Sequence, residues 1–531
     1  MTLSYESLLR LLESPPEDNG LRWEISDESW RTGCYPRSVH RHGETLFFIG
    51  RDLRGKHLYA VLKSVEDVLT DFADIEEVGV LDRGARLLRL SMNHENAKQI
   101  QQRFAFTRPV LLGTSDSFGL GDRLGVAGPG QLRGILGSGF RPILAQQSIR
   151  ELNRTGREPQ DVMDAAVWTV FQEGYHDGFG ADADHLKSPA DVDRMVAAGF
   201  NFFTIDPGDH VINEADILAP AELEDRFKDV PFDEMDTTAT ELVDRYSGRE
   251  IGFSSGFSLQ PSRDEVLRAA VKYGKSLAHT VTMFRYLKRR YPDHPCEFEM
   301  SVDETESVTS PFEHYFVASE LKRLDVELIS LAPRFVGTFE KGIDFRGDLG
   351  EFRREYRKHL EIARHLGGYK LSIHSGSDKF SVYRVIGELK GSPVHVKTAG
   401  TSYLEALRTV AQVQPELMRE ILEYSRKLYE TERRSYHVSA VLDNVPQGTA
   451  LKNSDLERLF DSDDARQVLH VTFGRILTDR AFDGSYLFKE RILSVLETYE
   501  DQHYANLVKH FQRHVRQFRS TRHQGDDRPR L

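Results

Sequence analysis

Short apolar runs recur from residue 108 onward, and each is followed by a polar or glycine-containing turn and then by a helical pattern. The candidate strands are eight such runs, at residues 110–113, 142–145, 180–183, 200–205, 297–302, 327–331, 369–373 and 394–397. Strands that alternate with helices form parallel sheets, and eight such units are typical of a (β/α)8 TIM-like barrel. This alternation constrains the fold more than any other feature of the chain.

Periodicity indicates the helices between these strands. Val266, Ala270, Tyr273, Leu277 and Val281 recur at spacings of four, three, four and four residues, which places them on one helical face. A doubly wound sheet would show the same alternation, and the number of strands alone does not exclude it. No G-x-G-x-x-G motif follows a candidate strand, however, so the nucleotide-binding version of that sheet is disfavoured.

The length predicts additions to the barrel. A single core stops growing at about 250 to 300 residues, and this chain has 531. We expect an N-terminal α/β addition at 1–105, with a short helix at 7–12 and strands at 45–49, 57–61 and 85–90. The barrel is expected at 106–415 and a C-terminal helical extension at 416–518. Residues 519–531 are polar without apolar periodicity, which predicts a disordered tail.

Composition excludes several classes of protein. Only two cysteines occur, Cys34 and Cys296, so neither a disulfide framework nor a cysteine-rich zinc site is expected. The net charge of -13 argues against a general nucleic-acid binder. No apolar run approaches the roughly 20 residues that span a bilayer, and the amino terminus lacks the pattern of a secretion signal. We therefore expect a cytoplasmic protein with no membrane or nucleic-acid partner.

Polar and titratable residues follow most of the candidate strands. After the first strand comes TSDSFGLGDRLG (114–125), a loop rich in glycine and hydroxyl groups that fits neither a Walker motif nor a dinucleotide fingerprint. The residues of interest after the later strands are Arg150, Asp184, His185, Glu299, Asp303, His374, Ser375, Lys379, His395 and Lys397. Glu299 and Asp303 have the same parity on the fifth strand, so both would face the barrel interior if one does.

A single Asp or His after a strand is most often a helix cap or a solvated loop group. Several strand ends that carry histidines and carboxylates together are harder to explain in this way. A metal site on a barrel needs imidazoles and carboxylates from several strands. Without cysteines the ligands must be N and O donors, which suits Mn, Fe, Co, Ni or Zn.

Six dispersed segments resemble those of the tagaturonate epimerase family. They are ILAQQSIRELNRTGR (143–157), FQEGYHDGFGADADHLK (171–187), FFTIDPGDHV (202–211), SVDETE (301–306), LSIHSGSDKFSVY (371–383) and HVKTAGTSYLEA (395–406). The resemblance runs from about residue 108 to 437 and more loosely to 470. It implies a metal-dependent isomerase that interconverts D-tagaturonate and D-fructuronate in hexuronate breakdown, with a sugar-acid substrate. Relatives that act on the neutral ketohexose exist, so the resemblance leaves the choice between these two substrates open.

Within this framework we expect His185, His374 and His395 to bind the divalent metal, because they lie on three different strands. His395 precedes Lys397 and so lies deeper in its strand. We expect Asp184 to accept a proton and Glu299 to donate one. Arg150, Asp303, Ser375, Lys379 and Lys397 are the expected contacts to the substrate carboxylate or hydroxyl groups.

The reaction inverts a hydroxyl-bearing carbon β to the ketone, so simple enolisation does not reach it. Retro-aldol cleavage and recombination is favoured over deprotonation of the inverting carbon, which is not acidic. Two alternatives stay open: another metal-dependent sugar epimerase, isomerase or aldolase, and a sugar-binding regulatory protein on an enzyme-like fold. A homo-oligomer is also left open.

Overall fold

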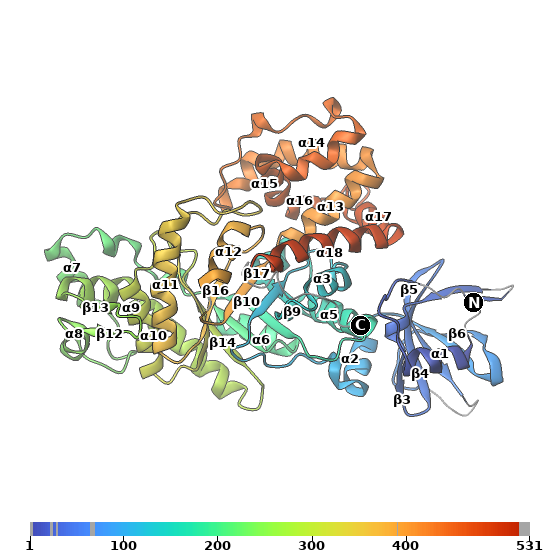
Figure 1. The fold of residues 1–531 in the computed structure, drawn as a ribbon, viewed down its shortest axis with the longest axis horizontal. Coiled ribbons are helices and arrows are strands. Elements are labelled where there is room, and N and C mark those ends of the chain that lie inside the picture. The colour runs from blue at the N-terminus through green and yellow to red at the C-terminus, as the bar shows by residue number, and fades with distance from the viewer. Residues whose placement is uncertain (1–3, 22–24, 28–29, 64–68, 390, 520–531) are drawn as a thin grey trace.

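Eight parallel strands close into a barrel at the centre of the computed structural model (Figure 1). The structure describes residues 4–21, 25–27, 30–63, 69–389 and 391–519. In chain order the barrel strands are β8 (Ser117–Leu120), β9 (Arg141–Ser148), β10 (Gly180–Leu186), β11 (Phe202–Ile205), β14 (Glu297–Ser301), β15 (Leu328–Ala332), β16 (Lys370–Ile373) and β17 (Val394–Thr398). β17 pairs with β8 to close the ring. The predicted TIM-like barrel is therefore confirmed.

Helices follow the strands and cover the outside of the barrel. They are α3 (Gly128–Ile135), α4 (Ile149–Thr155), α5 (Pro159–Glu173), α6 (Pro189–Ala197), α7 (Pro220–Phe227), α8 (Ala239–Tyr246), α9 (Arg263–Arg290), α10 (Pro311–Arg323), α11 (Leu349–His365), α12 (Phe380–Leu389) and α13 (Thr401–Val413). A two-stranded hairpin of β12 (Ile251–Gly252) and β13 (Ser258–Leu259) precedes α9. The apolar face predicted for α9 is buried as expected, from Val266 to Val281.

The first predicted strand was wrong. Residues 110–113 form no strand, and Val110 and Leu111 are 39% and 47% exposed. The strand is β8, which lies within the segment predicted to be a glycine-rich loop. Gly119 is required in this strand because a Cβ there would lie 1.7 Å from Oε1 of Gln146. The glycine that suggested a loop is thus a close-packing position inside the barrel.

The N-terminal addition is a seven-stranded antiparallel sheet with a helix on either side of it in sequence. Its elements are α1 (Tyr5–Glu13), β1 (Ile25–Asp27), β2 (Trp30–Cys34), β3 (His40–His42), β4 (Thr45–Asp52), β5 (Gly55–Leu62), β6 (Ile75–Val80), β7 (Arg86–Leu90) and α2 (His94–Arg103). The predicted strands at 45–49, 57–61 and 85–90 correspond to β4, β5 and β7. The sheet contacts the barrel helix α5, where Nε2 of His40 lies 2.9 Å from the carbonyl oxygen of Phe171.

The C-terminal helices form a second apolar core beside the barrel (Figure 1). The helices of this core are α14 (Pro415–Glu432), α15 (Asp463–Val471), α16 (Phe473–Thr478) and α17 (Lys489–Thr498), whereas the last helix, α18 (Glu500–Arg516), packs into the main core of the barrel. The predicted tail lies outside the described residues except for Arg519. Among the helices that the structure describes, none combines the length and apolar character needed to cross a bilayer.

Helix α18 packs closely against α3 of the barrel. Two glycines of α3 allow this approach, because a Cβ on Gly130 would lie 2.8 Å from Leu507 and one on Gly134 would lie 2.7 Å from Cβ of Phe511. Such separations are too short for a real Cβ, so α18 sits directly on the backbone of α3. The packing brings His510 and His514 of α18 next to Asp378, which follows barrel strand β16.

We predict that Gly134→Val destabilises the protein, because the added methyl groups must displace Phe511. Overpacking of this kind typically costs about 1–3 kcal/mol. Urea unfolding of the purified variant measures the loss. Gly252→Val is the matched control, since a Cβ there has no atom within 4 Å. Equal stability of the two variants would contradict the close packing of α18 on α3.

Candidate active site

Two adjoining cavities open at the carboxyl ends of the barrel strands. The outer cavity is about 230 Å³ and the inner cavity is about 50 Å³. The residues that line both are Arg150, Asp303, Lys341, His374, Ser375 and Tyr436. The active sites of TIM-barrel enzymes lie at this end of the barrel. Most residues predicted from the strand ends are found here.

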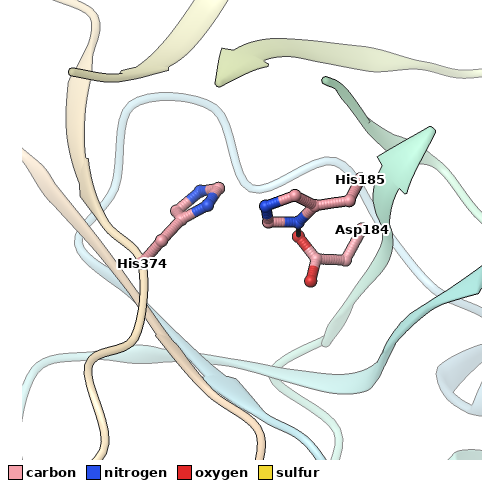
Figure 2. A group of neighbouring side chains, drawn as sticks. All are labelled: Asp184, His185 and His374. Atoms are coloured by element: carbon pink, nitrogen blue, oxygen red, sulfur yellow. Dashed lines mark hydrogen bonds and ion pairs between the residues drawn. The ribbon is translucent and has the colours of Figure 1, made fainter. Parts of the chain in front are cut away.

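The end of β10 supplies a carboxylate and an imidazole. Nδ1 of His185 lies 2.8 Å from Oδ1 of Asp184, and Figure 2 shows this contact with the His374 ring opposite. His185 has a φ of 54°, a left-handed conformation that is uncommon for a side-chain-bearing residue. The strained backbone turns the His185 side chain toward the cavity, and strain of this kind is concentrated at functional sites.

His374 follows β16 and lies between two carboxylates. Its Nε2 is 2.8 Å from Oε1 of Glu299, and its Nδ1 is 3.2 Å from Oδ1 of Asp303. The same oxygen of Asp303 is 3.5 Å from Nε2 of His185. The ring centroids of His185 and His374 are 5.0 Å apart. Asp303 therefore borders both imidazoles from the end of β14.

Lys397 of β17 lies beneath these groups. Its Nζ is 2.7 Å from Oδ1 of Asp184, 2.8 Å from Oδ2 of Asp182 and 2.9 Å from Oε1 of Glu299. The ammonium group also donates to Oγ1 of Thr204 at 2.6 Å. All of these side chains point into the barrel, so one buried cation holds three carboxylates together.

Charge pairing decides the protonation of these groups. Burial alone would raise the pKa of Asp184, but the charges of His185 and Lys397 outweigh it and hold the pKa well below its usual range. Burial likewise opposes ionisation of Glu299, and Lys397 and His374 keep its pKa low. Burial would lower the pKa of His374, but Asp303 and Glu299 raise it to about 9. The carboxylates are therefore ionised at neutral pH.

Asp184, His185 and His374 form a group of donor atoms suited to a metal ion. One ligand atom from each lies within 4.8 Å of the others (Figure 2). Nε2 of His185 is buried and makes no hydrogen bond among the described residues, although Asp303 lies 3.5 Å from it. Two imidazoles with adjacent carboxylates are a donor set that binds Zn, Mn, Fe, Co or Ni. The residues present therefore fit a divalent cation.

A second group of similar residues, Asp378, His510 and His514, is a structural contact. Nδ1 of His514 donates to the carbonyl oxygen of His510, and Nε2 accepts from the backbone N–H of Asp378. Both nitrogens of His514 are thus used. The carboxylate of Asp378 pairs with Arg466 and His510, which fixes the loop that follows His374.

The structure corrects two of the sequence-based expectations. His395 lies deeper in the barrel, where Nδ1 is 3.0 Å from Oγ of Ser117, and it lines neither cavity. Lys379 is also absent from both linings, because its Nζ donates to the backbone carbonyls of Glu340 and Ser377. The greater depth of His395 agrees with its place before Lys397 in the strand, and Lys379 lies in the loop after β16, whose path the strand pattern does not predict.

Arg150, Ser375 and Asp303 lie at the cavities as expected. Arg150 is at the rim, where it pairs with Glu304 at 2.9 Å. Oγ of Ser375 accepts a hydrogen bond from Lys341 at 2.7 Å. Glu299 lines neither cavity and reaches them only through His374 and Lys397.

Sequence reasoning missed several residues of the cavity walls, including four with polar side chains that line the inner cavity. These four are Arg123, Lys341, Tyr436 and His470. Arg123 lies in the glycine-rich segment 114–125, which matched no known binding motif. Lys341 lies in an irregular segment between β15 and α11, and the other two come from the C-terminal region. Arg123 comes directly after β8, a strand whose position was predicted wrongly, and the other three follow no barrel strand directly, so the strand-end pattern carries no signal for those three.

Comparisons with known proteins agree with this site. The sequence model of the tagaturonate epimerase family (UxaE) matches residues 35–518. A tagaturonate/fructuronate epimerase from Thermotoga maritima is 43% identical over 485 residues, which cover 91% of this chain and 96% of that protein.

Two crystal structures of the fructuronate-tagaturonate epimerase UxaE from Cohnella laeviribosi superpose with TM-scores of 0.84. The glycerol complex is 36% identical and covers 91% of this chain and 96% of that one. The native structure is 34% identical, with coverage of 97% and 99%. These matches favour a carbohydrate epimerase over the aldolase and regulatory alternatives. The chain therefore belongs to the tagaturonate epimerase family.

Proposed function

We propose that this protein interconverts D-tagaturonate and D-fructuronate with the help of a divalent cation. The observation that carries the proposal is the group of Asp184, His185 and His374 in a cavity at the carboxyl ends of the barrel strands. The relative from Thermotoga maritima carries this activity in its name and shares 43% identity over nearly the whole chain. The family match and the donor set thus support the same reaction.

His185 and His374 are the proposed metal ligands. Each imidazole has one nitrogen close to a carboxylate, since Asp184 lies at Nδ1 of His185 and Glu299 at Nε2 of His374. Carboxylates placed in this way orient metal-binding histidines and make them more basic. Asp303 lies nearest to the opposite nitrogens and is the proposed carboxylate partner. A bound divalent cation supplies an electrophile for the ketone oxygen and makes a neighbouring hydroxyl group more acidic.

The proposed reaction is a retro-aldol cleavage followed by recombination. Asp184 accepts the hydroxyl proton at the inverting carbon, and the bond between this carbon and the one next to the ketone breaks. The products are an aldehyde fragment and an enediolate. The aldehyde turns its other face to the enediolate, the bond re-forms, and the new alkoxide takes back a proton. No atom or electron is gained or lost overall.

Glu299 is the proposed donor of the returned proton, which it must first receive from Asp184 because it is itself ionised at neutral pH. It lies below the cavity, but Lys397 is within 2.9 Å of Glu299 and 2.7 Å of Asp184. A proton can therefore pass between the two carboxylates by way of the ammonium group. Asp303 is the competing candidate, because it lines both cavities directly. General acid and base groups must lie within hydrogen-bond reach of the proton that they move.

Metal removal tests the cofactor. Chelation should abolish turnover of D-tagaturonate because the substrate oxygens lose their electrophile, and Mn, Co, Ni or Zn should restore part of it. NMR follows the sugars while elemental analysis measures bound metal. Full activity of protein shown to be metal-free would contradict the proposal.

His374→Ala should lose both bound metal and activity while the fold survives, because only one cavity side chain is removed. Elemental analysis, circular dichroism and turnover on the same sample test this. His365→Ala is the matched control, since His365 is exposed on α11. Stoichiometric metal in His374→Ala would remove His374 from the ligand set.

The variants Asp184→Asn and Glu299→Gln should bind the substrate but lose turnover. Each amide keeps the shape of the carboxylate that it replaces but cannot accept or donate its proton. Acid and base groups typically contribute about 100- to 10,000-fold, or about 3–5 kcal/mol of barrier. Turnover, bound metal and melting temperature are measured together, with Asp303→Asn alongside. Near-normal turnover in Glu299→Gln with loss in Asp303→Asn would move the donor role to Asp303. A drop of about 10- to 100-fold in metal affinity would instead make Glu299 an orienting group for His374.

The cytoplasmic location, the absence of nucleic-acid partners and a homo-oligomeric state stay predictions. So does the preference for the ketouronate over the neutral ketohexose.

A further inference from the structure

The lining of the inner cavity contains two chemically different groups of residues. One group is Asp184, His185, His374 and Asp303, to which the proposed reaction assigns the chemistry. The other, called the cationic end here, is Arg123, Lys341, His470 and the loop at Ala399 and Gly400, where His470 contacts Arg123 and lies against Gly400. A ketouronate also has two chemically different ends, with a keto group and hydroxyls toward one and a carboxylate at the other. The proposed roles leave the cationic end of the cavity without a function.

Arg123 brings a buried guanidinium to this end. It is 3% exposed, and its Nε and Nη2 donate to one oxygen of Glu151 at 3.1 and 2.9 Å. Its Nη1 is buried and has no partner among the described residues. Phe473 lies under the guanidinium, with 3.5 Å between Cζ and the ring centroid. Glu151 therefore fixes Arg123 in place but leaves one N–H edge unused.

His470 supplies a second unused donor beside it. Its Nε2 is 3.3 Å from Nη2 of Arg123. A guanidinium only donates, so Nε2 is the acceptor and the proton of the neutral ring lies on Nδ1. Burial, followed by the charges of Arg123 and Lys341, lowers the pKa of His470 well below its usual value, which agrees with a neutral ring. Nδ1 is buried without a partner among the described residues.

The amino terminus of α13 points its backbone at the same end. The helix begins at Thr401 after Gly400, and no side chain caps it. A Cβ on Gly400 would lie 1.8 Å from Cε1 of His470, so the imidazole sits directly against this turn. The free N–H groups and dipole of a helix amino terminus favour an anion. α13 follows the eighth barrel strand, where TIM barrels often bind anionic groups.

Lys341 adds a full positive charge. It borders both cavities, and its Nζ donates to Oγ of Ser375 at 2.7 Å. No carboxylate forms an ion pair with it in the part of the chain that the structure describes. The side chain is half-buried rather than free in solvent. Its charge is thus available to a ligand.

We propose that this end of the cavity, formed by Arg123, Lys341, His470 and the amino terminus of α13, binds the carboxylate of the ketouronate substrate and selects it over a neutral ketohexose. The inference rests on the proposed function and extends it. In a retro-aldol reaction the carboxylate stays on the aldehyde fragment. When the carboxylate is bound at this site, the aldehyde fragment stays in the cavity. Its aldehyde group can then turn about the bond next to the inverting carbon.

Kinetics with two substrates test the proposal. D-tagaturonate and D-tagatose differ only in carrying a carboxylate or a hydroxymethyl group at the end in question. Lys341→Met should lower kcat/KM for D-tagaturonate by on the order of 10- to 100-fold, which is typical of a lost hydrogen bond to a charged group. The loss should appear mainly in KM, and kcat/KM for D-tagatose should stay within about twofold. Lys427→Met, at an exposed position on α14, is the charge-matched control and should change neither value.

Arg123→Lys is the second variant, because it keeps a charge beside Glu151 but removes the unpaired N–H edge. This variant should lose kcat/KM for D-tagaturonate while keeping that for D-tagatose. If it fails to fold, the kinetics of Lys341→Met alone test the proposal. Equal losses on both substrates, or an unchanged kcat/KM for D-tagaturonate in Lys341→Met, would overturn the proposal.

Calorimetry separates this inference from the proposed reaction. The metal-loaded protein is titrated with D-galacturonate, D-galactose and inorganic phosphate, none of which it needs to turn over. Tighter binding of D-galacturonate than of D-galactose, lost in Lys341→Met, supports the carboxylate site even if the protein epimerises neither ketose. Equal or absent binding of the two sugars overturns it. Tighter binding of phosphate than of D-galacturonate would reassign the site to phosphorylated ligands and overturns the carboxylate assignment.

Discussion

The shared contact of Lys397 with three carboxylates is the interaction on which the active site depends. Asp182 and Asp184 come from β10, Glu299 from β14 and Lys397 from β17. Side chains from three barrel strands are therefore joined through the side-chain nitrogen of Lys397. Burying several carboxylates is costly unless a cation and hydrogen bonds compensate. Removing one partner of a buried pair typically costs about 3–5 kcal/mol. The same contact that stabilises the barrel interior therefore holds the reactive acids in position.

The C-terminal helices continue this positioning outward. The loop after β16 carries His374, Ser375 and Asp378, and both Ser375 and Asp378 have positive φ angles. Backbone of this kind persists only where the surroundings hold it. Arg466 of α15 and the histidines of α18 bind Asp378 on three sides. The helices added after the barrel thus support the turn from which His374 reaches the cavity, and the close approach of α18 to α3 is what brings them there.

Sequence reasoning reached the barrel and one end of the cavity. Alternating runs revealed most strands, and residues that directly follow a strand, such as His185 and His374, could be placed together because barrel strands end at one rim. The sequence showed that His395 lies deeper than Lys397 but not that this depth takes it away from the cavity, and it did not show the path of the loop that carries Lys379. Arg123 and His470 were beyond prediction for a different reason. They are separated by more than three hundred positions and meet only because α15 folds over the barrel.

The balance of carboxylates and cationic groups accounts for the two kinds of residue in the cavity lining. Three carboxylates contact Lys397, and a fourth, Asp303, contacts the two imidazoles. Lys370 is a second buried ammonium group near Glu299 and Asp182, so the carboxylates still outnumber the cations and the reactive end has an excess of negative charge whenever both imidazoles are neutral. The raised pKa of His374 reflects this excess, since a proton on the ring offsets part of it. A divalent cation supplies the same positive charge when it replaces such protons. An anionic substrate would still be repelled by these carboxylates if its own carboxylate lay among them. The proposed carboxylate site at Arg123 and Lys341 would avoid this repulsion and would orient the substrate with its keto group toward the histidines.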